Sequence, residues 1–322
     1  MSKQSTLNMT NNNLTSVSEF ILVGFTDCPE WEIPLFLVFL SIYCITVLGN
    51  MGMVILIQVD VQLHIPMYFF LSHLSLMDVC YTTVITPQIL ATLATGKTVI
   101  TYNQCAVQFF FFTFCASTEC FLLAVMAYDR YVAISNPLLY TVAMSPRKCW
   151  SLVVGAYVCG LSGSIQRTTC TFSLSFCEDN MINFFFCDLP PLLKLACSDT
   201  TNAEIVIVLF GNFVILVNAV IILISYLLII KTIMRIKSSG GRSKTFSTCV
   251  SHLIAVVLFF GTLTFMYIRS GSGKSIEEDK IVSVFYTVII PMLNPLIYSL
   301  RNKDVKVAFR KATKRLQVSQ SG

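Results

Sequence analysis

Seven long apolar segments restrict what this chain can fold into more than any other feature. They cover residues 33–58, 66–91, 102–134, 147–167, 202–236, 243–268 and 280–300. Each approaches or exceeds the length of about 20 apolar residues that an α-helix needs to cross a bilayer. Only 12% of the 322 residues are charged, against about 25% in a soluble domain. We therefore predict an all-α membrane protein, built as a bundle of seven transmembrane helices.

A shorter segment, residues 302–316, follows the seventh apolar segment and alternates basic with apolar side chains. This pattern predicts an amphipathic helix that lies on the membrane surface and contacts its lipids. The chain then divides into an N-terminal tail (1–32), a membrane domain (33–300) and a C-terminal amphipathic helix with its tail (301–322). We find no internal repeat.

Basic residues gather at one end of the predicted bundle, in residues 147–148, 231–244 and 301–315. Because such residues favour the cytoplasmic side, the C-terminus is predicted to be cytoplasmic. Seven crossings then place the N-terminal tail outside, in a multi-pass protein of the plasma membrane. Two glycosylation sequons, at Asn8 and Asn13, agree with an extracellular, glycosylated tail. No basic run resembles an arm that binds nucleic acid, and no cleavable signal peptide is evident.

Two acidic residues, Asp78 and Glu119, lie deep in apolar segments, with Asn50 and Asn294 at comparable depth. Because a buried charge is costly without a partner, these side chains are expected to face the interior of the bundle. Three interpretations stay open. The acids are protonated and hydrogen-bonded, or the four residues hold a small cation such as sodium, or the acids relay protons in a transporter.

Two further positions are candidates for moving parts. The third segment ends on Asp129 and Arg130, which form either an ordinary interfacial ion pair or a switch in which Asp129 holds and then releases Arg130. In the seventh segment, Asn294 and Pro295 form a weak point, since proline removes a backbone hydrogen bond. That weak point is either a static kink or a hinge.

Cysteines mark the opposite end of the bundle. Cys105 begins the third segment, and Cys170, Cys177, Cys187 and Cys197 lie between the fourth and fifth segments, in an oxidising compartment. Spacing alone does not choose among the pairings that such a set allows.

Several long motifs resemble one family. Residues 126–135 (MAYDRYVAIS), 63–72 (LHIPMYFFLS), 244–253 (KTFSTCVSHL) and 291–302 (PMLNPLIYSLRN) are similar to the odorant (olfactory) receptors among rhodopsin-like G-protein-coupled receptors, in their land-vertebrate (class II type) branch. Two positions depart from the family pattern. Ser135 stands where cysteine is usual, and Phe260 replaces a tyrosine in the Phe-Tyr-Gly of the sixth segment.

The resemblance implies a function, a partner and a set of moving residues. The chain would be an odorant receptor that activates a heterotrimeric G protein of the stimulatory, olfactory type and raises cyclic AMP. It also implies the disulfides Cys105–Cys187 and Cys177–Cys197, and it supports sodium as a bound ion, with no other cofactor. The residues expected to rearrange on activation are Asp129, Arg130, Tyr131, Tyr226, His252, Asn294, Pro295 and Tyr298.

A ligand site is expected in the outer half of the bundle, between the third, fifth, sixth and seventh helices. Helical spacing back from Arg130 places Phe112, Thr113, Ala116 and Ser117 on its third-helix wall. The resemblance supplies the opposing walls: Phe210, Gly211, Val214, Phe260, Leu263, Thr264, Tyr267, Val284 and Thr287. For each residue, ordinary bundle packing is the alternative. The walls are apolar and aromatic without a buried charge, so we expect a small, volatile, neutral, largely apolar odorant.

Three other functions were weighed. A receptor for a lipid or a peptide fits the closely matching helix-two and helix-seven motifs less well. A transporter would show repeated halves and broken helices, which the sequence lacks. An enzyme is disfavoured because none of the three histidines, His64, His73 and His252, is paired with a Cys or an acid at a catalytic spacing.

Overall fold

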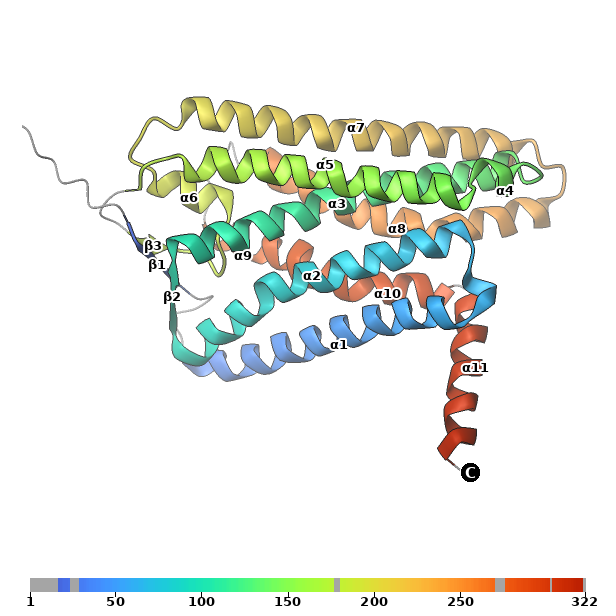
Figure 1. Cartoon of the computed structure of the whole chain (residues 1–322), viewed down its shortest axis with the longest axis horizontal. Coiled ribbons are helices and arrows are strands. Elements are labelled where there is room, and N and C mark those ends of the chain that lie inside the picture. Colours follow the sequence, from blue (N-terminus) through green and yellow to red (C-terminus); the bar gives the residue numbers. More distant parts are fainter. Residues whose placement is uncertain (1–16, 24–28, 177–179, 270–275, 302, 321–322) are drawn as a thin grey trace, which may run out of the picture.

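The computed structural model describes residues 17–23, 29–176, 180–269, 276–301 and 303–320. Long helices lie side by side along the longest axis of the molecule (Figure 1). They are α1 (Glu32–Val59), α2 (Pro66–Thr95), α3 (Tyr102–Ser135), α5 (Pro146–Phe172), α7 (Thr201–Met234), α8 (Ser239–Arg269), and α9 (Ile276–Val284) continued by the π-helical turn η3 (Phe285–Ile289) and α10 (Ile290–Arg301). Short helices α4 (Tyr140–Ala143) and α6 (Leu189–Leu195) lie in loops.

The bundle confirms the predicted fold class. Within the described residues, six helical stretches are long and apolar enough to span a membrane, and α8 is the seventh when its two halves, bent by 43°, count as one span. The helix α11 (Lys303–Gln320) follows at an angle to the bundle (Figure 1). Val305 and Ala308 of α11 are buried, and its Lys311 donates a hydrogen bond of 2.7 Å to Gln62.

Local signals explain where α3 begins and ends. At its start, Gln104 N donates to the Thr101 hydroxyl, and Gln104 Oε1 accepts from Thr101 N, which forms a capping box. At its end, Pro137 prevents the helix from continuing. The end of α5 was predicted less well. This helix runs to Phe172 rather than to residue 167, which adds more than one turn at the end of the bundle away from α11 (Figure 1). We call that end of the bundle outer and the end with α11 inner.

A small sheet at the outer end was not predicted. Its strands are β1 (Glu19–Val23), β2 (Lys97–Thr101) and β3 (Met181–Ile182), in the order β2-β1-β3. β1 pairs antiparallel with β2 and parallel with β3. Phe20 and Leu22 of β1 are fully buried, as expected from the alternation of side chains along a strand. Part of the predicted N-terminal tail is therefore fixed against the bundle.

Close helix contacts in the bundle depend on glycine. A Cβ atom at Gly49 of α1 would lie 3.2 Å from the ring of Pro295 in α10. A Cβ atom at Gly160 of α5 would overlap the side chain of Thr118 and lie 3.1 Å from its backbone nitrogen. Small residues at such crossings let membrane helices approach each other closely.

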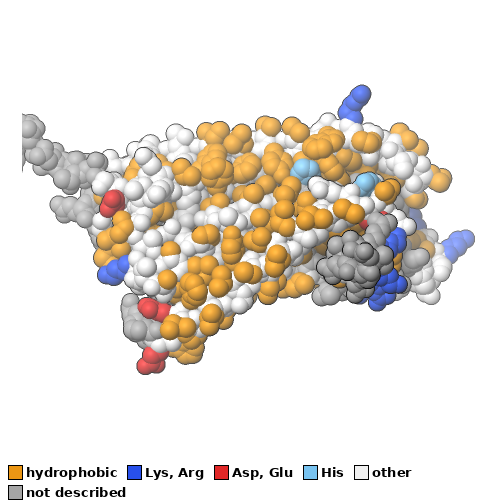
Figure 2. Space-filling view, turned by 60° about the horizontal axis from the view of Figure 1, so that its bottom comes forward, with side chains coloured by type: hydrophobic (Ala, Val, Ile, Leu, Met, Phe, Trp, Pro, Cys, Tyr) orange, Lys and Arg blue, Asp and Glu red, His pale blue; other side chains and the backbone are white. Residues whose placement is uncertain are grey.

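The surface separates apolar from charged side chains (Figure 2). Apolar side chains cover the middle of the visible face, and basic side chains gather at the end that carries α11. Exposed apolar side chains also include Leu48 of α1 and Leu209 and Phe213 of α7. A belt of this kind suits contact with lipid tails rather than with water.

Candidate functional site

The inner end of α3 is held by a hydrogen bond that the sequence did not predict. Asp129 is buried, and its Oδ1 accepts a hydrogen bond of 2.8 Å from the hydroxyl of Tyr140 in α4. Its Oδ2 is buried without a partner among the described residues. Burial and the neighbouring Asp129 raise the pKa of the Tyr140 hydroxyl, so Tyr140 remains a donor. The structure thus holds Asp129 through Tyr140, and not through the predicted ion pair with Arg130.

A second set of hydrogen bonds joins three helices, and we call it the inner lock: Tyr226 of α7, His252 of α8 and the Leu123 carbonyl of α3. The Tyr226 hydroxyl lies 2.7 Å from His252 Nδ1, and His252 Nε2 lies 3.1 Å from the Leu123 oxygen. Because a carbonyl only accepts, Nε2 carries a proton and donates. Nδ1 of the neutral imidazole then accepts from Tyr226. The lock holds the inner halves of α3, α7 and α8 together.

The other predicted moving residues lie around this lock. The charge of Arg130 acts electrostatically on Tyr226, His252 and Tyr298. Tyr298 is buried, and its hydroxyl has no hydrogen-bond partner among the described residues. Tyr131 is half-buried, with its ring 6.5 Å from that of Tyr128. The structure therefore brings Arg130, Tyr226, His252 and Tyr298 together.

The polar centre of the bundle contains the four residues predicted for a cation. Asn294 Nδ2 lies 3.0 Å from both carboxyl oxygens of Asp78. Asn50 Nδ2 donates to the Pro291 carbonyl at 3.0 Å, which joins α1 to α10. Glu119 Oε1, Asn50 Oδ1 and the Ser75 hydroxyl are buried without partners within the described chain.

These unpaired oxygens are hard ligands of the kind that a small cation takes. The described residues contain no group of three or more His, Cys, Asp or Glu side chains that could hold a metal ion. Because these unpaired atoms are oxygens, the donor set fits a hard cation better than a transition metal.

The outer end is closed by a tethered loop. The structure joins Cys105 to Cys187, the pairing that the resemblance implies, with their Cα atoms 5.6 Å apart. Gln108 Oε1 also accepts from the Cys187 backbone nitrogen at 2.9 Å. Cys197 is disulfide-bonded too. Its expected partner Cys177, like the sequons at Asn8 and Asn13, lies outside the described residues.

Aromatic rings of this loop cover the bundle. Phe186 lies edge-on to Phe112 of α3, with their centroids 5.1 Å apart. Tyr286, in the π-helical turn η3, lies 6.3 Å from Phe112 and donates a hydrogen bond of 3.2 Å to Asp188 Oδ2. Asp188 Oδ1 accepts from the backbone nitrogen of Leu189, the first residue of α6. One buried carboxylate thus connects the loop to the seventh helix.

Burial raises the pKa of Asp188 to about 6, although the hydrogen bonds from Leu189 and Tyr286 act in the opposite direction. A hollow of about 120 Å³ lies beside this carboxyl group and is lined partly by Lys194 and Asp279.

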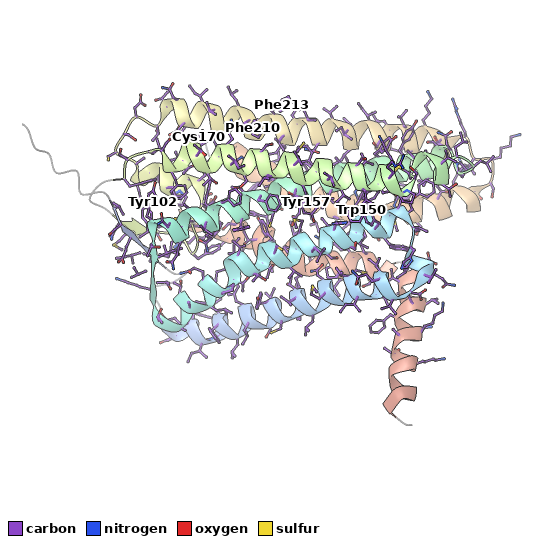
Figure 3. The ribbon with its side chains drawn as sticks, viewed as in Figure 1. Tyr102, Trp150, Tyr157, Cys170, Phe210 and Phe213 are labelled. Atoms are coloured by element: carbon purple, nitrogen blue, oxygen red, sulfur yellow. A yellow bond between two sulfur atoms is a disulfide. The ribbon has the colours of Figure 1, made fainter. Side chains whose placement is uncertain are left out.

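Three of the predicted ligand residues face α5 rather than open space. The Thr113 hydroxyl is 2.9 Å from that of Ser164 in α5. The Phe210 ring lies 3.0 Å from a Cβ position at Gly163, and the Ser117 hydroxyl lies 4.0 Å from that position. Figure 3 shows Phe210 between α7 and α5, with Phe213 on the outer edge of α7. Ser117 and Phe210 therefore both lie against Gly163, and we call this pair of side chains the Ser117–Phe210 wall.

The remaining predicted ligand residues differ in exposure. Gly211, Val214, Phe260 and Thr287 are buried, Ala116, Leu263 and Val284 are half-buried, and Thr264 is exposed. Thr287 donates to the Ser283 carbonyl within its own helix. The side chain of Tyr267 lies outside the described ones.

Sequence reasoning missed Tyr140, Asp188, Tyr286 and Arg167. Arg167 escaped notice because α5 was predicted to end there, where an arginine is an ordinary interfacial charge. Its spacing of four and seven residues from Gly163 and Gly160 is the signal that could have placed it on the packed face of α5.

Comparison with known proteins gives concordant results. Residues 39–315 match the family model described as olfactory receptor. Over 313 residues the chain is 79% identical to Olfactory receptor 9I1 of Homo sapiens, which covers 97% of this chain and 100% of that protein. It is 58% identical to Olfactory receptor 9Q2 of Homo sapiens, over 94% of this chain and 97% of that one. It is 55% identical to Olfactory receptor 5AP2 of Mus musculus, over 94% and 95% of the two chains.

Proposed function

The chain belongs to the olfactory receptor family, and on that premise we propose how it works. It binds a small, neutral, largely apolar odorant between α3, α7, α8 and the seventh helix. It then activates a stimulatory, olfactory-type G protein, which raises cyclic AMP. It is a membrane receptor and not an enzyme.

The inner lock is the observation that carries this proposal. Tyr226, His252 and the Leu123 carbonyl fasten three helices by hydrogen bonds between buried groups. Breaking these hydrogen bonds would leave buried polar groups unsatisfied, which is costly. The closed arrangement is therefore one discrete state, and in an open state the same groups must find new hydrogen-bond partners. The charge of Arg130 acts on Tyr226, and on activation Arg130 would supply such a partner. Opening of α8 would expose the cytoplasmic face to the G protein.

The outer half supplies the coupling to a ligand. The loop with Phe186 is tethered to α3 by Cys105–Cys187 and covers Phe112, so the ligand would contact rings that are already fixed in place. A ligand that packs better against one arrangement of α3, α7 and α8 shifts the balance between the two states. The apolar and aromatic lining favours an odorant of low polarity.

We propose sodium for the polar centre. Asp78, Glu119 and the unpaired oxygens of Asn50 and Ser75 would hold the ion, which would supply positive charge to an otherwise unbalanced pair of acids. We also propose that the end with α11 faces the cytoplasm and that residues before β1 are extracellular and glycosylated. The distribution of basic residues supports this orientation.

Cyclic AMP in cells that express this chain with the olfactory G protein tests the proposal. An odorant panel should give a response in the parent chain, and Arg130→Ala at matched surface level should abolish it. Arg147→Ala, at the inner end of α5, is the matched control and should respond like the parent. A full response without Arg130 would contradict the proposed coupling.

A further inference from the structure

The outer half of α5 carries one charged side chain, Arg167, on the face that packs into the bundle. Gly160, Gly163, Ser164 and Thr171 of this face are buried. Arg167 follows Gly163 by four positions and Gly160 by seven, so it lies on the same face of the helix. It is itself half-buried.

Two buried groups on different elements interact with the Arg167 charge. One is Cys120 of α3 and the other is Asp188 of the tethered loop. They are 4% and 7% exposed, so both lie within the bundle. Because Arg167 follows Gly163 by four residues, it lies one turn outward from the Ser117–Phe210 wall, and its electrostatic effect on Cys120 and Asp188 agrees with a side chain that faces α3 and the loop.

The guanidinium of Arg167 lacks a partner there. Its Nε is buried without a hydrogen bond, and no described residue forms an ion pair with it. The hydroxyl of Thr171, one turn further out, is also buried without a described partner. An arginine side chain can only donate hydrogen bonds, and a buried donor without an acceptor is costly. The missing group is therefore an acceptor.

We propose that Arg167 is the polar anchor of the ligand site and that it selects neutral odorants with a carbonyl oxygen, namely aldehydes, ketones or esters. This inference rests on the proposed receptor function. The apolar part of the odorant would lie against the Ser117–Phe210 wall, and its carbonyl oxygen would accept from the guanidinium.

A carbonyl fits this position better than a carboxylate. Asp188 already supplies a negative charge near Arg167, and Asp279 acts on the same carboxyl group, so the outer site has no excess of positive charge. A carboxylate ligand would add a further negative charge beside a half-buried side chain, where an uncompensated charge is costly. A carbonyl satisfies the donor without changing the charge. Carboxylic acids are thus the informative competitors in a test.

The first experiment uses an eight-carbon series: octanal, 2-octanone, methyl heptanoate, octanoic acid and octane. Cyclic AMP is measured for the parent chain, Arg167→Met and Arg167→Lys at matched surface level. We expect the three carbonyl compounds to act on the parent and their potency to fall about tenfold or more in Arg167→Met, with a smaller loss in Arg167→Lys. Ile165→Met, on the exposed face of the same helix, should leave every potency unchanged.

The second experiment does not depend on G-protein coupling. The melting temperature of purified receptor is measured with and without octanal. An unpaired buried donor predicts that Arg167→Met melts at the same or a higher temperature than the parent, and that octanal raises the melting temperature of the parent alone. A lower melting temperature in Arg167→Met, with Ile165→Met unchanged, would assign Arg167 a structural role and overturn the proposal.

The two experiments separate the failures. If octane or octanoic acid activates the parent chain in preference to the carbonyl compounds, the proposal that Arg167 is the anchor is overturned, and the proposed receptor function is supported. Equal potency of octanal on the parent and Arg167→Met would do the same. Stabilisation of the parent by octanal without cyclic AMP would support the anchor and contradict the proposed coupling. If no carbonyl compound activates the parent chain and octanal does not stabilise it, the proposal that Arg167 is the anchor is overturned.

Discussion

The hydroxyl of Tyr140 lies 2.8 Å from Asp129 Oδ1 and ties the short helix α4 to the inner end of α3. The acid next to Arg130 is thus held from the loop rather than by its neighbour in sequence. Because Asp129 is buried, the arrangement of α4 decides whether this carboxyl group is satisfied. Any movement that removes α4 frees Asp129 to find another donor.

Replacing Tyr140 by phenylalanine should therefore raise basal activity. Loss of the Tyr140 hydroxyl removes its hydrogen bond to Asp129, and a hydrogen bond to a charged group contributes about 1.5–3 kcal/mol. The equilibrium therefore shifts toward states in which Asp129 has another partner. We expect basal cyclic AMP to rise several-fold at equal surface level. Tyr128→Phe is the control, because Tyr128 is on α3 but makes no hydrogen bond among the described residues. An unchanged basal level in Tyr140→Phe would mean that this contact is not part of the resting state.

The inner lock predicts coupling between Tyr226 and His252. Tyr226→Phe removes the donor and leaves His252 Nδ1 buried and unsatisfied, and His252→Phe removes both hydrogen bonds of the ring. Each should lower the melting temperature of the purified receptor by a few degrees. The double variant should lose less than the sum, with a coupling of about 1 kcal/mol. Strict additivity would show that the two side chains do not act as a unit.

Gly160 and Gly155 offer a matched test of helix packing within α5. Gly160→Ala places a methyl group against Thr118, including its backbone nitrogen at 3.1 Å, which cannot move without shifting α3. Overpacking of this kind costs about 1–3 kcal/mol, so the melting temperature should fall. Gly155 has nothing within 4 Å of its Cβ position. Gly155→Ala should be neutral or slightly stabilising, and a fall as large as that of Gly160→Ala would point to a different cause.

The seven helices could be predicted because each carries its own signal. Length and apolar content fix a membrane helix locally, and the prolines at 66, 137 and 146 mark boundaries that the structure reproduces to within a few residues. The resemblance also grouped Tyr226 with His252, and the structure places these two side chains in hydrogen-bond contact; their part in a switch stays a prediction.

Contacts between distant segments could not be read from the same signals. The strand β1 pairs with residues about 80 and 160 positions away, and its five residues, EFILV, are too few to indicate a strand alone. Asp129 has two adjacent donors in sequence, Arg130 and Tyr128, yet its partner is Tyr140. The orientation of Thr113 toward Ser164 likewise depends on how α3 and α5 are rotated against each other, which helical spacing does not fix.

Asp188 makes the outer end sensitive to acid. Its carboxyl group accepts from Tyr286 and from the backbone of Leu189, and burial raises its pKa to about 6. A raised pKa means that the folded receptor binds this proton more tightly than the unfolded chain. The contribution to stability is therefore largest at low pH and is lost as pH rises through about 6. Of the charged groups nearby, Asp279 raises this pKa and Arg167 lowers it.

Lowering the pH from 7.5 to 5 should accordingly raise the melting temperature of the purified receptor, by an amount that corresponds to about 1 kcal/mol from Asp188. Asp188→Asn mimics the protonated form and should remove this part of the pH dependence, so that its melting temperature exceeds that of the parent mainly at pH 7.5. Asp199→Asn, at an exposed position after the same loop, is the control and should keep the pH dependence of the parent. If Asp188→Asn also keeps the pH dependence of the parent, then the Asp188 carboxyl group is not the group whose titration causes it.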